Sequence, residues 1–454
     1  MKEYHLTDFR ITPAVVQNGV ATEITIAPTG DHTVFLDGYE YTVEIWPAEE
    51  TTARLDGCAV KRIKLYAADG KLVFTETFCG EQQFTIKIIL PEELQYYPNP
   101  YYKPPYCGRR IKHAALGHPM LYLYSVNEDL YGLTVYKGDM HIHTYDSDGR
   151  ESVGGVIANL KKAGFDYAAI TDHYWYDSSV KAKELFADLP DVFTCLPGEE
   201  VHTPVEYIHV VSIGASQSVN KYYFEHQDEC EACIRELAET LKIPEGIDRY
   251  NYASRYWVAE TSRKFGGMPV LTHPFWIWET VYFVPPKITE FTFEHGNYEA
   301  FELLNGACGR ETNNLQTAFY FEERAKGFDM PIVGSSDCHK TDREDDRMPT
   351  DAYTLVLAKD RSWESIHDAI LKKRNVAVEH YETDKNPRLY GSYRMVKYMN
   401  FLLLNYYPLY MELCHEQGVL MKEYAYTKDS SLIELIQLLK QRSDAFTDAF
   451  FGKK

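Results

Sequence analysis

Residues of the types that bind metal ions recur through the middle of the chain, each beside a short apolar run. The segments are Asp139-Met140-His141-Ile142-His143, Asp148-Gly149, Thr171-Asp172-His173, Pro197-Gly198-Glu199-Glu200, Tyr207-Ile208-His209, His273-Pro274 and Asp337-Cys338-His339. Imidazole and carboxylate ligands together suit zinc, manganese or iron. Several cations held close together can activate water and stabilise both oxygens of a bond being cleaved, which is the chemistry this set predicts.

The spacing within these segments has a physical reason. In extended chain, residues two apart point to the same side. His141 and His143 can therefore reach one metal while Ile142 faces away, and Asp337 and His339 can do the same around Cys338. Of the adjacent pair at 199–200, only one carboxylate can face the metals.

A single histidine at a strand end is more often a hydrogen-bonded core residue than a ligand. Of the 16 histidines in the chain, those that stand beside apolar runs here are His141, His143, His173, His209, His273 and His339. Independent core histidines would not select such positions so regularly, so the set predicts a metal site.

The elements that must position these residues begin near residue 137. Helical stretches end in glycine and lead directly into apolar strands, as at Gly164, Gly266-Gly267 and Gly327. The helices expected are Ser152–Ala163, Asp228–Leu241, Tyr252–Phe265, Asn314–Lys326 and Trp363–Lys373. Alternating strands and helices predict a mostly parallel sheet, whose strand C-termini gather catalytic residues.

The rest of the chain has a different pattern of apolar, polar and turn residues. Residues 1–136 read as an N-terminal β-sandwich-like domain, with short alternating runs separated by Gly, Asp and Pro turns. The expected strands include Thr22–Ile26, Tyr41–Ile45, Lys61–Tyr66 and Phe84–Ile89, and Tyr96–Pro105 is expected to be a long surface loop. Residues 137–385 form the predicted α/β barrel, and residues 386–454 a C-terminal helical extension.

Composition restricts the partners. The 454 residues carry a formal net charge of −20, which disfavours nucleic acid and anionic membranes as partners. Metal ions could still attract a phosphorylated small molecule. The N-terminus has no signal-peptide core, and nine scattered cysteines argue against a disulfide framework, so we expect a cytoplasmic protein. Met399–Cys414 is too short and too polar to span a bilayer.

In order along the chain, the motifs His-x-His, Ser-Asp-Gly, Thr-Asp-His, Pro-Gly-x-Glu, x-His-x-x, Thr-His-Pro and Ser-Asp-x-His resemble the polymerase-and-histidinol-phosphatase (PHP) family. The run Glu302-Leu303-Leu304-Asn305-Gly306 also resembles its pattern, and the resemblance covers about residues 137–380. It implies a distorted (β/α)7 PHP-type barrel, here following the N-terminal all-β domain, with two or three divalent metal ions (Zn, Mn or Fe).

Carried over motif by motif, the resemblance implies one metal held by His141, His143 and Asp337. A second would be held by His209 and His273, with Glu200 bridging the two. A third would be held by Asp148, His173 and His339, although many family members have His where Asp148 stands. Asp172 would orient a neighbouring group. Glu200, Asp337 and His273 are the candidate catalytic residues.

The function expected is a metal-dependent hydrolase that cleaves a small phosphorylated metabolite through a metal-bound hydroxide. The alternatives are a carbamate, ester or amide hydrolase using the same site and, outside enzymes, a metal-binding structural or regulatory module. A homo-oligomer is compatible with the sequence.

The stretch of about 25 residues between His273 and Glu302 is longer than most connections. It contains the aromatic residues Phe275, Trp276, Trp278, Tyr282 and Phe283, followed by Pro285-Pro286. These aromatics are expected either to wall a pocket at the metal site or to pack against the N-terminal domain.

Overall fold

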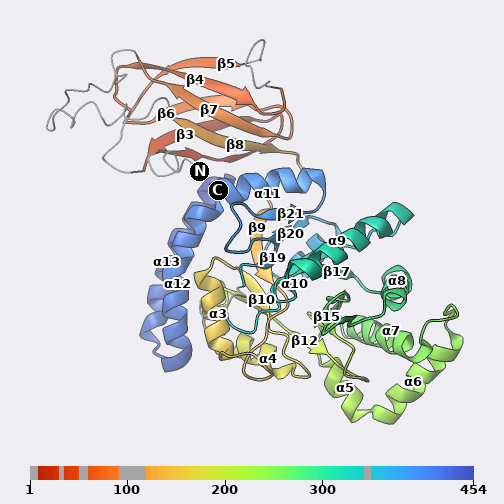
Figure 1. Ribbon diagram of the computed structural model, residues 1–454. Coiled ribbons are helices and arrows are strands. Elements are labelled where there is room, and N and C mark those ends of the chain that lie inside the picture. Colours follow the sequence, from red (N-terminus) through yellow and green to blue (C-terminus); the bar gives the residue numbers. More distant parts are fainter. Residues whose placement is uncertain (1–8, 30–34, 51–59, 92–118, 342–348, 454) are drawn as a thin grey trace. The chain divides into compact units, whose positions relative to one another are not determined.

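The computed structural model describes residues 9–29, 35–50, 60–91, 119–341 and 349–453 (Figure 1). By its internal packing the chain divides into two compact units. Unit 1 comprises Met1–Gly132, Lys397–Tyr410 and Ser443–Lys454, and unit 2 comprises Leu133–Val396 and Met411–Arg442. The expected loop at Tyr96–Pro105 lies outside the described residues.

Unit 1 contains two β-sheets. One has the strand order β1 (Phe9–Thr12), β3 (Ala21–Pro28), β6 (Leu72–Thr77), and the other β2 (Val15–Gln17), β8 (Met120–Val126), β7 (Gln83–Ile89), β4 (Glu40–Pro47), β5 (Lys61–Tyr66). Side chains alternate between buried and exposed along β6, as the period-two pattern predicts. Phe35 contacts Phe9 of one sheet and Tyr41 of the other, with ring centroids 4.7 and 5.2 Å apart. Every strand run expected in this part of the chain lies within an observed strand.

Unit 2 is a mixed α/β structure built on two larger sheets. The six-stranded sheet has the order β11 (Thr194–Leu196), β10 (Tyr167–Ala169), β9 (Thr134–Asp139), β19 (Ala352–Ala358), β20 (Asn375–Glu379), β21 (Arg388–Tyr390). The five-stranded sheet has the order β12 (Gly198–Val201), β13 (Val210–Ile213), β14 (Met268–Leu271), β17 (Ala300–Asn305), β18 (Ile332–Ser335). The interior of unit 2 is filled by apolar side chains from both sheets, including Met140, Tyr167 and Val211.

The strands are less uniformly parallel than expected. β9, β10 and β11 run parallel, as do β14, β17 and β18, but β13 is antiparallel to both its neighbours and β19 is antiparallel to β9. Isolated parallel bridges join the two sheets at one end, between Ile142 and Cys338 and between His173 and Glu200. A regular closed barrel of seven β/α units is therefore not confirmed, because in the described part of the chain the β-bridges between the two sheets are these isolated ones.

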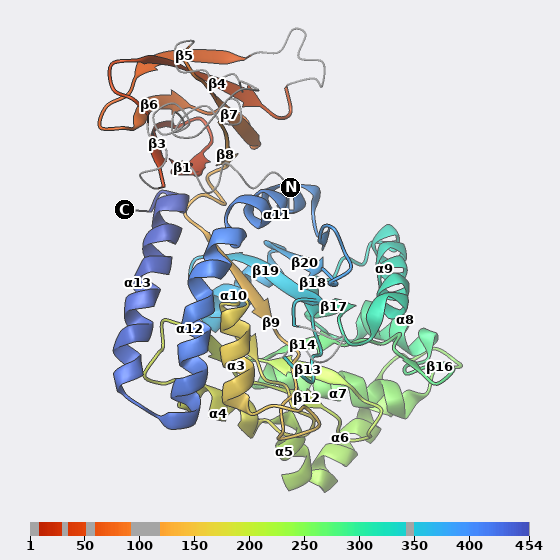
Figure 2. The same cartoon turned by 60° about the vertical axis from the view of Figure 1, so that its left-hand side comes forward.

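Helices surround these sheets (Figures 1 and 2). They are α3 (Val153–Lys162), α4 (Asp177–Leu185), α5 (Val219–Glu225), α6 (Gln227–Thr240), α7 (Arg249–Lys264), α8 (Pro286–His295), α9 (Gly309–Lys326) and α10 (Trp363–Leu371). All five expected helices are present. Gly164, Gly266 and Gly327 have φ of +78°, +79° and +105°, the left-handed conformation expected after a helix end.

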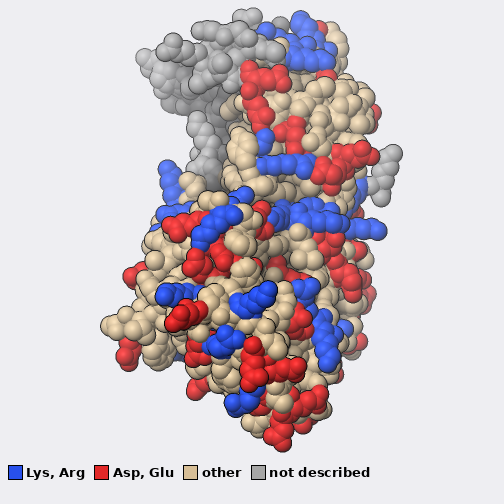
Figure 3. Space-filling model, turned by 90° about the vertical axis from the view of Figure 1, so that its right-hand side faces the viewer, with Lys and Arg blue, Asp and Glu red and all other residues tan. Residues whose placement is uncertain are grey.

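The C-terminal residues are helical, as expected: α11 (Tyr393–Asn405), α12 (Tyr407–Thr427) and α13 (Ser431–Phe451). Within unit 2, α12 approaches α3 so closely at Gly418 that a Cβ there would lie 2.3 Å from the Lys162 nitrogen. Among the described residues, no helix has the length and apolar character needed to cross a membrane. On the face shown in Figure 3, acidic and basic side chains are interspersed.

Candidate metal centre

The nine residues expected to bind metal converge at the bridged end of the two sheets. They fall into overlapping groups whose nitrogen and oxygen atoms lie within 4.8 Å of one another. These groups are His143–Asp148–His173–His339, His141–His143–Glu200 and Glu200–His209–His273. Asp337 joins them through Oδ1, which lies 3.0 Å from His143 Nε2 and 3.4 Å from His141 Nε2.

Glu200 lies at the centre of the cluster, and its side chain is almost completely buried. Its Oε2 is 3.2 Å from His141 Nε2 and 2.9 Å from His173 Nδ1, and its Oε1 is 2.6 Å from His209 Nδ1. His273 Nε2 approaches Oε1 to 3.5 Å. One carboxylate thus faces histidines from both sides, the placement that a bridging ligand requires.

Glu199 points the other way. Its carboxylate accepts hydrogen bonds from Ser218 Oγ, the Val219 backbone nitrogen and Asn220 Nδ2 at the start of α5. Acidic groups are favourable at a helix N-terminus, where backbone N–H groups lack partners. The side chains of Glu199 and Glu200 thus point to opposite sides, as expected for extended chain, and Glu199 stabilises the start of α5.

His209 reaches the site because its strand is reversed. It immediately precedes β13, which is antiparallel to β12 and β14, so the start of β13 lies level with the C-terminal ends of its neighbours. His209 differs in this from the ligands that follow strand C-termini, and the reversed strand accounts for its position. Its place before the apolar run, rather than after it, was the signal in the sequence.

Two of the histidines have one ring nitrogen engaged away from the cluster. His141 Nδ1 lies 2.9 Å from Glu302 Oε1, and His339 Nδ1 lies 2.9 Å from the Asp337 carbonyl oxygen. Both acceptors favour a proton on Nδ1, which leaves Nε2 to face the cluster. Metal-binding histidines are commonly oriented in this way.

The contacts of the Glu302 carboxylate were not predicted from the sequence. Besides facing His141, its carboxylate accepts hydrogen bonds from the His273 backbone nitrogen at 3.2 Å and from Asn305 Nδ2 at 3.0 Å. The run Glu302–Gly306 resembled the family pattern, but a contact across 161 residues of chain could not be read from it.

The loop that carries Asp148 is held by Asp172. The Asp172 carboxylate accepts hydrogen bonds from the Thr144 nitrogen at 2.6 Å, from Thr144 Oγ1 at 2.5 Å and from Ser147 Oγ at 2.7 Å. A Cβ at Gly149 would lie 2.6 Å from the His143 carbonyl oxygen, so only glycine fits the turn after Asp148. The expected orienting role of Asp172 thus has a geometric basis.

Two residues of the cluster have unusual backbone conformations. Asp337 has φ of +51° and His273 has φ of +22°. Positive φ is uncommon for residues other than glycine and is concentrated at functional sites, where surrounding structure maintains it. Asp337 is secured by its nitrogen, which donates to the His141 carbonyl oxygen at 2.8 Å.

The cluster concentrates negative charge that needs compensation. Burial alone would lower the pKa of His141, but Asp337, Glu302 and Glu200 raise it well above its ordinary value. Burial would likewise raise the pKa of Glu200, but His209 and His141 hold it well below the usual range. Burial lowers the pKa of His143, and it lowers that of His209 to about 3, so these two rings offer lone pairs rather than protons.

The residues present fit a metal centre. Among the described residues, both ring nitrogens of His143, His209 Nδ1 and Glu200 Oε1 are buried and make no hydrogen bond. Their close contacts, His209 Nδ1 with Glu200 Oε1 at 2.6 Å and His143 Nε2 with Asp337 Oδ1 at 3.0 Å, lack hydrogen-bond geometry. Buried polar atoms are rarely left unsatisfied. Lone pairs of nitrogen and carboxylate oxygen that converge without hydrogen bonds are the donor set that divalent transition metals prefer.

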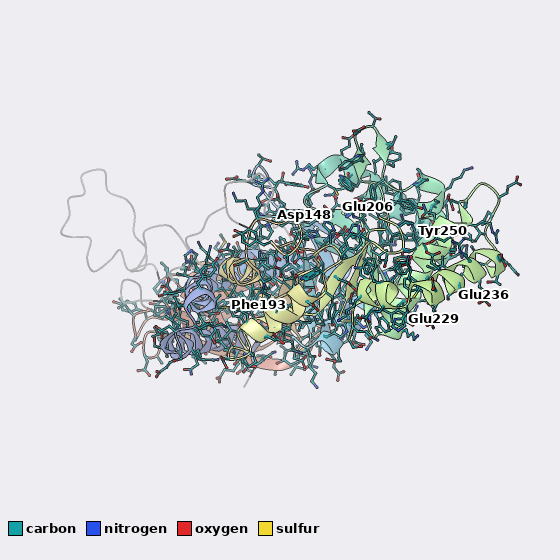
Figure 4. The ribbon with its side chains drawn as sticks, turned by 90° about the horizontal axis from the view of Figure 1, so that it is seen from below. Asp148, Phe193, Glu206, Glu229, Glu236 and Tyr250 are labelled. Carbon is teal, nitrogen blue, oxygen red and sulfur yellow. The ribbon has the colours of Figure 1, made fainter. Side chains whose placement is uncertain are left out.

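Further residues border the cluster. His202 is only 5% exposed, although it follows Glu200 closely in a polar stretch of the sequence. The connection after His273 forms a hairpin of β15 (Ile277–Trp278) and β16 (Val281–Tyr282). Seen from below in Figure 4, Asp148 and Glu206 lie apart from Glu229 and Glu236 on α6.

Comparison with known proteins gives structural likenesses only. No family model and no curated protein matches the chain. The solved structures that it resembles include a two-domain protein containing a predicted PHP-like metal-dependent phosphoesterase from Bacteroides vulgatus, with 20% identity and a TM-score of 0.39. That match covers 55% of this chain and 66% of the other, so this chain spans just under two thirds of its length.

Two further matches are similar. A protein of Bifidobacterium adolescentis proposed to be a metal-dependent phosphoesterase has 15% identity and a TM-score of 0.33, covering 46% of this chain and 90% of the other. An amidohydrolase from Chromobacterium violaceum has 17% identity and a TM-score of 0.32, covering 44% and 87%. At TM-scores below 0.5 these likenesses carry no weight for function, which must be inferred from the cluster itself.

Proposed function

We propose that the chain is a metal-dependent hydrolase that cleaves a small phosphoester. The observation that carries this proposal is the convergence of six histidines, Asp148 and Asp337 around Glu200, with buried donor atoms that make no hydrogen bond. The ligands would be His141, His143 and Asp337 for one ion, His209 and His273 for a second, and Asp148, His173 and His339 for a third. Glu200 would contact the first two ions.

Ions held there would supply an activated water and positive charge opposite the oxygens of the scissile group. The protein's own contribution is rigidity and exclusion of water. Glu200 and His141 are fully buried, and Asp172 and Glu302 fix groups beside them. Ligands held in this way need little reorganisation during the reaction.

The substrate is proposed to be small because bulky side chains flank the second group of ligands. Phe283 lies against His209 with ring centroids 4.4 Å apart, and Trp276 lies 5.7 Å from the His273 ring. Trp276 and Phe283 also contact each other, with centroids 5.1 Å apart. Such a wall lowers the local dielectric and strengthens electrostatic interactions at the centre.

A substrate panel tests the proposal. Chelator-treated protein reloaded with Zn²⁺, Mn²⁺ or Fe²⁺ is assayed with phosphate monoesters and diesters, carboxylic esters, carbamates and amides, with Glu200→Gln as the inactive control. Phosphoester turnover that depends on metal and on Glu200 is expected. Turnover of carbonyl substrates alone would replace the phosphoester with the carbonyl alternative. Full metal loading without turnover of any substrate would favour a structural or regulatory metal module.

A further inference from the structure

We propose that His202 is a positioning residue that fixes which nitrogen of His173 faces the ion held with Asp148 and His339. This inference rests on the proposed metal centre and adds to it a residue outside the nine ligands. His202 follows Glu200 by two positions and reaches the same cluster from the end of β12.

A chain of close contacts fixes the positions of the ring hydrogens. His202 Nδ1 lies 3.2 Å from the Glu206 carbonyl oxygen. A carbonyl oxygen only accepts, so His202 Nδ1 carries a hydrogen and the neutral ring has a free lone pair on Nε2. That Nε2 lies 2.6 Å from His173 Nδ1, which must then be the donor.

The consequence falls on the other nitrogen of His173. With its hydrogen on Nδ1, a neutral His173 presents the lone pair of Nε2, which lies 3.5 Å from Asp148 Oδ1. His339 Nε2 approaches the same carboxylate, at 3.1 Å from Oδ2. The hydrogen bonds from His202 to Glu206 and from His173 to His202 thus leave the lone pair of His173 Nε2 available to a cation.

Glu200 offers His173 a competing acceptor, since its Oε2 lies 2.9 Å from the same Nδ1. Both acceptors favour the same hydrogen position, so they do not oppose each other. When Glu200 contacts two ions, its oxygens are shared with positive charge and accept hydrogen bonds less well. His202 is then the acceptor that remains to hold the His173 ring.

His202 is itself held in place. Its backbone nitrogen donates to Asn220 Oδ1 at 3.1 Å, and Asn220 Nδ2 donates in turn to the Glu200 carbonyl oxygen at 3.2 Å. The Tyr174 ring covers it, with centroids 4.8 Å apart. A buried ring fixed by its backbone and by Glu206 suits an orienting role.

Three variants separate orientation from packing. His202→Leu removes the acceptor, while His202→Gln retains a carbonyl oxygen that can accept from His173 Nδ1. Tyr174→Leu removes the ring that covers His202 and leaves the acceptor in place. Each chelator-treated protein is titrated with Mn²⁺ in a calorimeter, and its melting temperature without metal confirms that it is folded.

The inference requires three equivalents in the wild type, the upper of the two numbers expected for the centre. Loss of an outer hydrogen-bond partner typically weakens metal binding about 10–100-fold, and this is expected for one equivalent in His202→Leu. His202→Gln should restore most of that affinity, and Tyr174→Leu should bind as the wild type does. Equal affinities in wild type and His202→Leu would overturn the inference, as would a failure of His202→Gln to recover.

The outcomes distinguish this inference from the proposed function. A wild type that binds only two ions overturns the role of His202, because His173 then holds no ion, but leaves the hydrolase proposal standing. A wild type that binds fewer than one equivalent defeats both.

Discussion

Ile142 and Cys338 pair as an isolated parallel bridge. The His141 carbonyl oxygen accepts from the Asp337 nitrogen at 2.8 Å, and the His143 nitrogen donates to the Cys338 carbonyl oxygen at 3.0 Å. Ile142 and Cys338, the middle residues of the His-x-His and Asp-x-His motifs, therefore lie side by side, and both are fully buried. His141, His143, Asp337 and His339, which flank this pair, are left facing the cluster together. Alternation in extended chain accounts for the two histidines of His-x-His, whereas Asp337 has a left-handed backbone with φ of +51°.

This arrangement predicts bound metal in the purified protein. We expect two or three transition-metal ions per chain in protein purified without chelator, measured by elemental analysis. Removing the ions should lower the melting temperature, because a ligand that binds only the folded state stabilises it. Fewer than one equivalent after resupply of zinc, manganese and iron would rule out the centre.

The neighbouring glutamates should separate metal binding from folding. Glu200→Gln is expected to abolish activity and reduce metal content, because an amide binds cations far less well than a carboxylate. Glu199→Gln should keep its metal but lose stability, by about 1–3 kcal/mol, because three hydrogen bonds at the start of α5 are disturbed. Metal analysis and thermal melting of both variants check this, and the reverse ranking would show that the register is wrong.

Much of unit 2 was predictable from local pattern. The helices and their glycine ends follow from periodicity and from the left-handed conformation at positions such as Gly164. The convergence of His141 with Asp337 follows from two-residue spacing at strand ends. That these residues act as ligands remains a prediction.

What the sequence could not supply depends on long-range pairing. β13 pairs antiparallel with β12 and β14, which brings His209 to the cluster. This strand direction depends on the neighbouring strands rather than on the residues of β13 itself. The antiparallel pairing of β19 with β9 likewise breaks the expected barrel order. The contacts of Glu302 with His141 and of His202 with His173 join side chains whose separation in sequence carries no periodic signal.

A buried lysine gives a prediction about pH. Lys137 lies in the core of unit 2, where its Nζ donates to the Ala163 carbonyl oxygen at 3.2 Å and lies 4.1 Å from the centre of the Phe165 ring. Burial lowers its pKa to about 7. The unfolded chain should bind this proton up to a pH of about 10, so between these values the unfolded state holds more protons and stability rises with pH.

Lys137→Met should remove that contribution. The free energy of unfolding of the wild type relative to Lys137→Met, measured by denaturant titration, is expected to increase between pH 7 and pH 9, with a limiting slope of about 1.4 kcal/mol per pH unit. Lys162→Met, on the exposed side of α3, is the control and should show a difference that does not change with pH. A constant difference for Lys137→Met would contradict the prediction.

The final prediction concerns the aromatic residues after His273. Trp276 lies 6.0 Å from the His209 ring and 5.7 Å from the His273 ring, measured between centroids, whereas Trp278 is 57% exposed and lies 5.3 Å from Trp276. If this wall binds substrate, Trp276→Ala and Trp278→Ala should raise KM for phenyl phosphate more than for methyl phosphate. The effect should be larger for Trp276, because its ring is nearer the proposed ligands. Burial of an aromatic ring contributes about 1.5–3 kcal/mol, so a change in KM of about tenfold or more is expected for Trp276→Ala.

Phe275 provides the matched control for this series. It is buried and packs on Phe319, with centroids 5.1 Å apart, so Phe275→Ala should lower the melting temperature without distinguishing the two substrates. If Trp276→Ala behaves in the same way, or raises KM equally for both phosphates, the aromatic residues serve packing. The substrate would then need no ring beside its scissile group.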